Sequence, residues 1–316
     1  MTQRIYAVDY MKIVIIAFVV IGHAGLGRET LGLPYVILAN TVFRTAVPLF
    51  AMASGFFLFR TGLKGRSRTW IFRLLVLYVT WYAVFFLIMR LWHQSALLNL
   101  REFLLGFYHL WFLEALAIGA VLLILFARKG PKVLARAAII CAVIGLSLQF
   151  LQVTHLVDIP LDIYRSGPFY IFPFVAMGYL FALGMADPKA LPWPLPDRAR
   201  MMRLAQIGFA LALVENTLTL TVIGPYALLE FPLGIFLLTP ALFGLILRIE
   251  APPTDLPLGQ MALAIYIMHV LFLYGATVLG WTHPLLPALA GFFVPALVVL
   301  GIRRLGWRQD PIRQSF

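Results

Sequence analysis

The chain has 316 residues, of which 62% are hydrophobic and 12% are charged. This composition is too apolar for a soluble domain and is typical of a protein that crosses a membrane several times. The formal net charge of +12 would suggest nucleic-acid binding in a soluble protein, but in a membrane protein it reflects which side the cations occupy. We therefore expect membrane lipid, and no nucleic acid, among the partners.

Cysteine and histidine usage excludes two further classes of site. The lone Cys141 lies in an apolar run, so the sequence predicts neither a disulfide framework nor a cysteine-based metal site. The six histidines are scattered without metal-ligand spacing. No metal is predicted.

Apolar windows of about 20 residues predict an all-α protein with about ten transmembrane helices. The predicted spans are 5–26, 34–59, 70–92, 109–127, 137–153, 168–185, 204–221, 226–247, 257–280 and 285–301. No loop is long enough for a soluble domain, so we expect one transmembrane domain over residues 1–316. If the N-terminus is inside, 20 of the 25 Lys and Arg residues fall on that side. This bias predicts that both termini are cytoplasmic.

The first span carries three ionisable residues, Asp9, Lys12 and His23. Such residues are costly in lipid and usually indicate a functional site. On a helix, Lys12 and His23 lie about 20° apart, and His23 is about 16 Å further along the axis. The pattern predicts one inward polar face with a cation near the entrance and a base deeper in the membrane.

The second span contains Arg44 well inside the hydrocarbon region, where it needs an anionic or carbonyl partner. Pro48 follows four residues later and removes a helical hydrogen bond, which kinks the helix. The change frees a backbone carbonyl as an acceptor or widens a crevice beside the helix. The residues alone fit a kinked helix with a buried ion pair as well as they fit a functional site. The loop that follows is basic, with Arg66, Arg68 and Arg73.

Two later spans also carry groups that can transfer protons. Span four begins His109-Leu110-Trp111, and Glu114 lies one turn further on the face of Trp111. Span nine carries Tyr266 and His269 on one face, at the depth expected for His23. A buried histidine more often completes a hydrogen-bond network than performs acid–base work, so both readings stay open for His269. Glu215 and Asn216 form a polar island in span seven, best explained as the wall of a hydrophilic tunnel.

Taken in order, these elements resemble the motifs of the acyltransferase-3 family of integral-membrane proteins. The matching residues are Lys12 and His23; Arg44, Pro48, Phe50, Ser54 and Gly55; His109, Leu110 and Trp111; Phe172, Phe174 and Gly178; and Gly259, Ile265, Tyr266 and His269. The sequence departs from the family at Lys12 and Trp70, where Arg is usual, and at Ala262, where Ser is usual.

The resemblance implies a multi-pass O-acyltransferase of the bacterial inner membrane. Such an enzyme moves an acyl group, most often acetyl, from cytoplasmic acyl-CoA to a hydroxyl of an extracytoplasmic glycan or lipid-linked sugar. Acetyl-CoA is then the donor co-substrate. The candidate catalytic residues are His23, Glu114 and His269, with His23 as general base or as carrier of an acyl intermediate and Glu114 as a supporting group that enters from the same side as His23. The implied acyl-CoA-binding residues are Lys12, Arg44, Arg66, Arg68 and Arg73.

Each assignment has a structural alternative. In that alternative, Lys12 pairs with Asp9 instead of binding a phosphate. Arg66, Arg68 and Arg73 then face anionic lipid and set the topology of the chain. The rival function is a proton-coupled transporter or exporter of a small polar or glycan substrate, with the intramembrane charges as its pathway.

Overall fold

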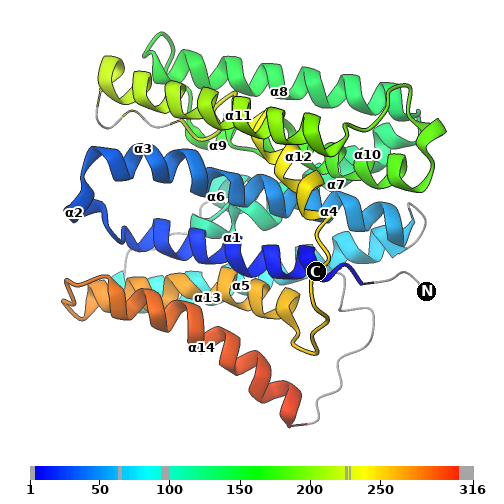
Figure 1. Ribbon diagram of the computed structural model, residues 1–316. Helices are drawn as coiled ribbons and strands as arrows, with labels where there is room; N and C mark the ends of the chain where they lie inside the picture. Colours follow the sequence, from blue (N-terminus) through cyan, green and yellow to red (C-terminus); the bar gives the residue numbers. More distant parts are fainter. Residues whose placement is uncertain (1–3, 63–65, 94–99, 225–226, 228, 306–316) are drawn as a thin grey trace. The chain divides into compact units, whose positions relative to one another are not determined.

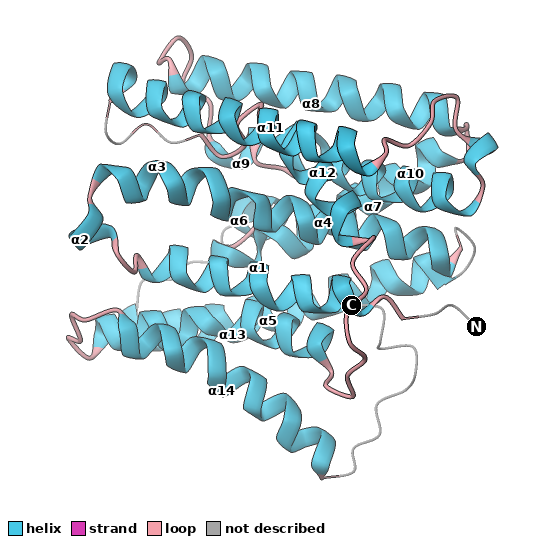
Figure 2. Ribbon diagram, in the orientation of Figure 1, coloured by secondary structure: helices cyan, strands magenta, loops and turns pink. Residues whose placement is uncertain are grey.

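The computed structural model describes residues 4–62, 66–93, 100–224, 227 and 229–305. Within these residues the protein is helical without any strand, as predicted (Figure 2). Its contacts form two compact units whose segments alternate along the sequence. The first unit comprises 1–50, 198–228 and 232–316, and the second comprises 51–197 and 229–231. The domain predicted over residues 1–316 therefore contains two packing units.

Nine helical segments in the described part of the chain are long and apolar enough to cross a membrane. An uninterrupted helix satisfies all its backbone hydrogen bonds internally, which is why such segments are stable in lipid. The chain is thus a multi-pass membrane protein. The segments are Tyr6–Ala24, Leu33–Thr61, Arg66–Arg90, Tyr108–Ala127, Pro131–Val153, Gly167–Ala186, Arg198–Ile223, Leu258–Val278 and Leu285–Arg304.

The tenth predicted span, 226–247, is helical only over α12 (Ile235–Ile246), and residues 225, 226 and 228 lie outside the described residues. Pro232 and Gly234 disfavour an earlier helix start. A Cβ on Gly234 would lie 2.3 Å from the backbone nitrogen of Ala212, in the middle of α11 (Arg198–Leu218). The start of α12 is therefore level with the middle of α11.

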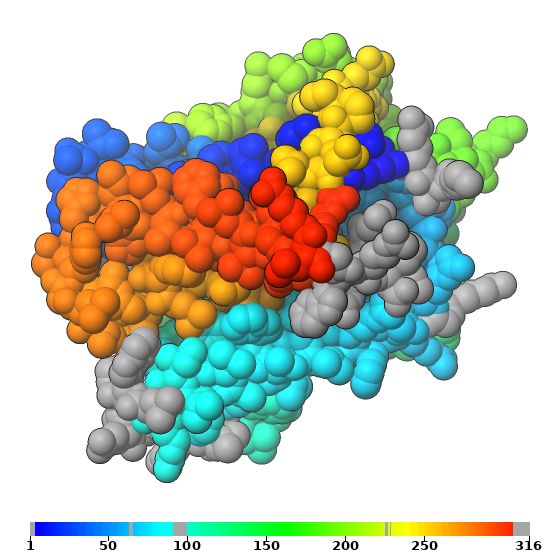
Figure 3. Space-filling model, turned by 90° about the horizontal axis from the view of Figure 1, so that it is seen from below, coloured from blue at the N-terminus to red at the C-terminus, as the bar shows by residue number. Residues whose placement is uncertain are grey.

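The first unit is built around three long helices, α1 (Tyr6–Ala24), α13 (Leu258–Val278) and α14 (Leu285–Arg304), which run side by side in Figure 1. The surfaces of α13 and α14 also adjoin in the space-filling view (Figure 3). Ile16, Ile265 and Ala288, one from each helix, belong to their common buried core. The unit also contains α2 (Arg28–Leu31), α3 (Leu33–Val42), η1 (Phe43–Thr45), the first turn of α4 (Ala46–Thr61), α11, η5 (Thr219–Ile223) and α12.

Both ends of the described chain lie on one side of this unit. Arg4 donates hydrogen bonds to the carbonyl oxygens of Thr254 (3.1 Å) and Leu256 (3.0 Å), just before α13. Arg303, at the end of α14, donates to the carbonyl of Asp255. The start of α1 and the end of α14 therefore meet the same loop, which agrees with two termini on one side of the membrane.

The second unit contains the remainder of α4 together with α5 (Arg66–His93), α6 (Leu100–Leu105), η2 (Tyr108–Leu110), α7 (Trp111–Ala127), α8 (Pro131–Val153), α9 (Leu161–Tyr164), η3 (Gly167–Ile171), α10 (Phe172–Ala186) and η4 (Pro188–Ala190). Helices α4 and α10 cross at two glycines. A Cβ on Gly55 would lie 1.9 Å from the Val175 carbonyl oxygen, and one on Gly178 would lie 1.9 Å from that of Met52. These glycines are required for close helix packing.

Candidate active site

The first unit brings His23 and His269 into direct contact. His23 is in the last turn of α1 and His269 is in the middle of α13. The Nδ1 atom of His23 lies 2.8 Å from Nε2 of His269. The ring planes differ by 3° and the ring centroids are 5.1 Å apart. With the two nitrogens only 2.8 Å apart, both lie close to the line between ring centres, so the rings meet end to end in a hydrogen bond.

The surroundings of His269 determine which nitrogens carry protons. Its Nδ1 lies 2.8 Å from the carbonyl oxygen of Tyr266 and 3.0 Å from that of Ile265. Carbonyl oxygens only accept hydrogen bonds, so Nδ1 of His269 carries a proton, and Nε2 of the neutral ring is an acceptor. His23 Nδ1 must then donate to it. This assigns the lone pair of neutral His23 to Nε2, the atom that a base or nucleophile needs.

The two histidines differ in exposure. His269 is 0% exposed, whereas His23 is exposed on the surface of the chain. Close packing holds the buried ring, because a Cβ on Gly291 of α14 would lie 3.1 Å from the His269 carbonyl oxygen and 3.3 Å from its Cβ. The arrangement has a fixed inner histidine that orients an accessible outer one.

Arg44 lies near the His23 end of α1. It belongs to η1, a turn of 3-10 helix between α3 and α4, and the neighbouring Phe43 stacks on Phe18 of α1 with centroids 5.1 Å apart. A Cβ on Gly22, next to His23, would lie 3.4 Å from the Phe43 ring. The helix is interrupted here because Pro48 has no N–H to donate to the Arg44 carbonyl four residues earlier.

Lys12 lies within an ion-pair cluster. It is 5% exposed, and its Nζ is 3.6 Å from Oδ1 of Asp9. The other carboxylate oxygen of Asp9 accepts a hydrogen bond of 2.7 Å from Arg4. The structure therefore contains the Asp9 pairing, which the sequence left as the alternative to a phosphate contact.

Glu114 belongs to the second unit, in the first turn of α7. It is 9% exposed, and no hydrogen bond or ion pair reaches its carboxylate from the described residues. A buried carboxylate is costly unless it is paired or protonated, although the positive end of the α7 dipole offsets part of this cost. Such a group is a strong functional candidate.

The three predicted coenzyme-binding arginines of the second unit lie in the first turns of α5. Arg66 and Arg68 are exposed and Arg73 is partly buried. Their positions suit long-range attraction of an anion better than an enclosed contact.

Comparison with known protein families assigns the chain. A family model described as an acyltransferase domain matches residues 5–304. This chain belongs to the acyltransferase-3 family. It is therefore a membrane acyltransferase, as the resemblance of its motifs indicated. No curated protein and no solved structure gives a match.

The predicted site residues are divided between the two units. Lys12, His23, Arg44 and His269 are in the first unit, whereas Glu114 and the three arginines of α5 are in the second. The structure thus joins His23 to His269 and places Arg44 near the same end of α1.

The sequence alone placed Glu215 in the wall of a hydrophilic tunnel and gave it no specific role. Its two carboxylate oxygens accept hydrogen bonds from the backbone N–H groups of Leu233 (3.0 Å) and Gly234 (2.9 Å). Glu215 therefore holds the turn that leads into α12. The sequence does contain a signal for this role. A glutamate lies in one span, and a proline and a glycine delay the start of the helix in the next span.

Sequence reasoning also missed Gln149, a buried residue in the apolar helix α8. Its Oε1 accepts from the N–H groups of Glu230 (2.8 Å) and Phe231 (3.0 Å), and its Nε2 donates to the Phe231 carbonyl (3.2 Å). Arg165 lies 3.5 Å from the Glu230 carboxylate and 4.7 Å above the Trp111 ring. A glutamine in an apolar span was the available signal, and its backbone partners lie 81 and 82 residues away.

Proposed function

We propose that this acyltransferase is an O-acyltransferase of the bacterial inner membrane. It transfers an acyl group, in the first instance acetyl, from cytoplasmic acyl-CoA to a hydroxyl of an extracytoplasmic glycan or lipid-linked sugar. The observation that carries the proposal is the His23–His269 hydrogen bond, because it leaves a basic nitrogen on the exposed ring.

The reaction uses His23 as general base. Its Nε2 takes the proton from the acceptor hydroxyl while the oxygen attacks the thioester carbonyl carbon. The carbon–oxygen bond forms, the carbon–sulfur bond of the donor then breaks, and the proton passes from His23 to the departing thiolate. Atoms and charges balance without a metal or a redox group.

His269 acts as a positioning residue. Its Nδ1–H is bonded to the backbone of its own helix, which leaves only Nε2 to accept from His23. The hydrogen bond selects one tautomer of His23 and stabilises the imidazolium that forms on proton transfer, much as the aspartate does in a catalytic triad.

The charged residues complete the proposal. Glu114 contributes as a second proton-transfer group because its buried carboxylate has no ion-pair partner among the described residues. Arg66, Arg68 and Arg73 draw the phosphates of acyl-CoA toward the cytoplasmic face, and Arg44 binds the part of the donor that lies near His23. Lys12 contributes through its pairing with Asp9, which keeps the start of α1 in place.

Two structural observations disfavour the transporter alternative. Glu215, which that pathway would use for protons, has both carboxylate oxygens bonded to backbone N–H groups. Asp9 and Lys12, at the entrance, are paired with each other. Groups bound in this way act as structural links rather than carriers.

The deciding experiment uses purified full-length protein in nanodiscs with acetyl-CoA and no transmembrane gradient. We expect release of free coenzyme A, by hydrolysis or by transfer to an added glycan acceptor, and we expect the His23→Ala variant to lose it. Thermal unfolding of both proteins controls for folding. Absence of coenzyme A release, combined with gradient-driven solute flux in sealed vesicles, would reject the enzyme and support the transporter.

A further inference from the structure

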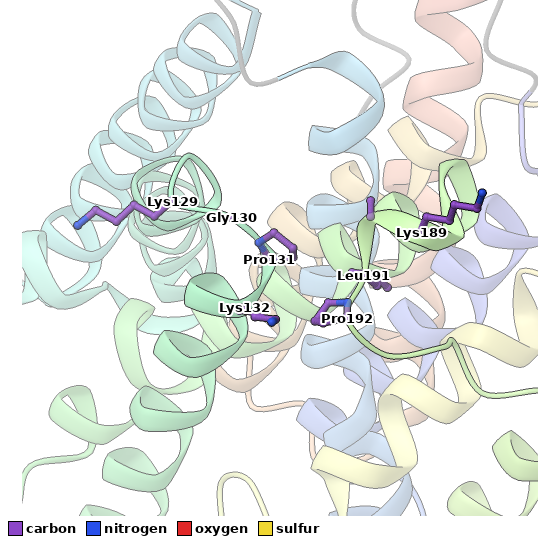
Figure 4. Close-up of a pocket in the computed structure, with 8 residues that line it drawn as sticks. Lys129, Gly130, Pro131, Lys132, Lys189, Leu191 and Pro192 are labelled. Carbon is purple, nitrogen blue, oxygen red and sulfur yellow. The ribbon is translucent and has the colours of Figure 1, made fainter.

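The second unit contains a cavity that is separate from the histidine pair and from every residue assigned above. It has a volume of about 330 Å³ and lies between the loop joining α7 to α8 and the segment that follows α10 (Figure 4). Its lining residues are Lys129, Gly130, Pro131, Lys132, Lys189, Ala190, Leu191 and Pro192. The cavity is large enough for a small ligand or the head of a larger one.

The lining is strongly basic. It contributes three lysines, Lys129, Lys132 and Lys189, and among the described residues it includes no Asp or Glu. The nearby Asp187 accepts a hydrogen bond of 3.0 Å from the backbone N–H of Lys189 and so caps η4. Three ammonium groups around one cavity repel one another until an anion neutralises them.

The three lysine side chains are exposed and able to turn toward a ligand. In Figure 4, Lys132 points toward Pro192, whereas the ammonium groups of Lys129 and Lys189 point outward from opposite walls. Each lysine has a flexible four-carbon stem, so its ammonium group can turn inward at small cost. The remaining wall, Pro131, Ala190, Leu191 and Pro192, is apolar. This combination suits a phosphate group attached to a less polar body.

The cavity lies where membrane spans end on the cytoplasmic side. Helix α7 ends at Ala127, α8 begins at Pro131 and α10 ends at Ala186, and the surrounding cations place these ends inside by the positive-inside rule. Phosphate esters are abundant at this level, both as lipid headgroups and as cytoplasmic nucleotides. The uncapped start of α8 adds a weaker attraction of the same sign.

We infer that this cavity is a binding site for a phosphate ester, held by Lys129, Lys132 and Lys189. Two molecules at this level carry such a phosphate ester. One is an anionic phospholipid, through its headgroup, and the other is coenzyme A, through its nucleotide end. The residues that the sequence assigned to acyl-CoA, namely Lys12, Arg44, Arg66, Arg68 and Arg73, are all described and do not line the cavity. The site is therefore additional to them and does not depend on the acyltransfer mechanism.

The test measures binding, without acyl transfer, on full-length protein. Adenosine 3′,5′-bisphosphate is titrated by calorimetry into protein in neutral phosphatidylcholine nanodiscs, and retained phosphatidylglycerol is counted by native mass spectrometry. The test variant carries Lys129→Gln, Lys132→Gln and Lys189→Gln. A second variant replaces the same lysines with Arg, and Arg136→Gln is the matched control, because Arg136 is exposed one turn further along α8 and outside the cavity.

We expect the Gln triple variant to bind one of the two probes about 100-fold more weakly. Each lysine near a membrane surface contributes about five-fold in affinity, and the three contributions multiply. The Arg triple variant and Arg136→Gln should bind as the wild type does. Loss of nucleotide binding identifies coenzyme A as the source, and loss of retained phosphatidylglycerol identifies the lipid. Unchanged binding of both probes by a Gln variant that unfolds at the wild-type temperature would overturn the site.

Discussion

Nδ1 of His23 and Nε2 of His269 lie 2.8 Å apart, although 246 residues separate them in the chain. The backbone carbonyls of Ile265 and Tyr266 hold the proton of His269 on Nδ1, so the outer ring must donate. The helix that buries His269 thereby decides which nitrogen of His23 is basic. In this membrane acyltransferase, the two histidines form one hydrogen-bonded pair.

Replacing His23 by Ala should abolish acyl transfer and leave insertion intact. A general base typically contributes 10²–10⁴-fold, and removing a polar side chain from a helix does not raise its cost in lipid. The measurement is acyl-CoA turnover by purified protein, with thermal unfolding as the folding control. His23→Asn should also fail because it cannot accept the proton. Turnover above about a hundredth of the wild type would contradict the base role.

His269→Gln should retain more activity than His269→Phe. The glutamine amide oxygen can still accept from His23 Nδ1 while its NH₂ donates to the Tyr266 carbonyl, whereas phenylalanine offers neither. We expect a loss of kcat with little change in the KM for acyl-CoA in both variants, since His269 orients the base and does not bind the donor. Equal activity of the two variants would show that the hydrogen bond is not used.

Gly291→Leu should lower kcat by displacing the backbone of His269. A Cβ at Gly291 already meets the His269 Cα at 3.2 Å, so a larger side chain must push α13 and α14 apart, at about 1–3 kcal/mol. Gly275→Leu in α13 is the matched control, because a Cβ there has no described neighbour within 4 Å. Turnover and thermal unfolding of both variants would be compared. An effect as large at Gly275 would mean that helix contact near His269 is not the cause.

A double-mutant cycle should separate the two roles of Lys12. The structure pairs Lys12 with Asp9 at 3.6 Å, so Lys12→Ala and Asp9→Ala should be non-additive by about 0.5–3 kcal/mol in unfolding free energy. Lys12→Arg should be tolerated. If Lys12 instead binds a phosphate of the donor, Lys12→Ala raises the KM for acyl-CoA and the second change does not compensate.

Glu215→Ala should destabilise the protein by about 1–3 kcal/mol, the usual effect of losing two hydrogen bonds, without abolishing transfer by the folded fraction. Its oxygens bond to the first free N–H groups before α12. Glu215→Gln should be milder because one oxygen remains. Thermal unfolding and turnover per folded molecule test this directly. Full stability with complete loss of function would return Glu215 to a transport pathway.

Much of the fold follows from the sequence alone. A backbone in lipid must satisfy its own hydrogen bonds, so apolar length predicts helices without knowledge of their neighbours. Nine of the predicted spans are found among the described residues. The motif positions, and hence the family, were equally visible, because they depend only on residue type and spacing.

The remaining features depended on tertiary packing. Periodicity assigned a face and a depth to His23 and His269, but their contact depends on α1, α13 and α14 packing together, with Gly291 against His269. The turn before α12 is held by Glu215 on another helix, which accepts the N–H groups of Leu233 and Gly234. Lys12 pairs with Asp9 within its own helix, and only the side-chain positions show that ion pair. In each case the deciding interaction is between specific atoms, often on distant segments of the chain. Helical spacing specifies the direction in which a side chain leaves its own helix, but it does not specify which helix packs there.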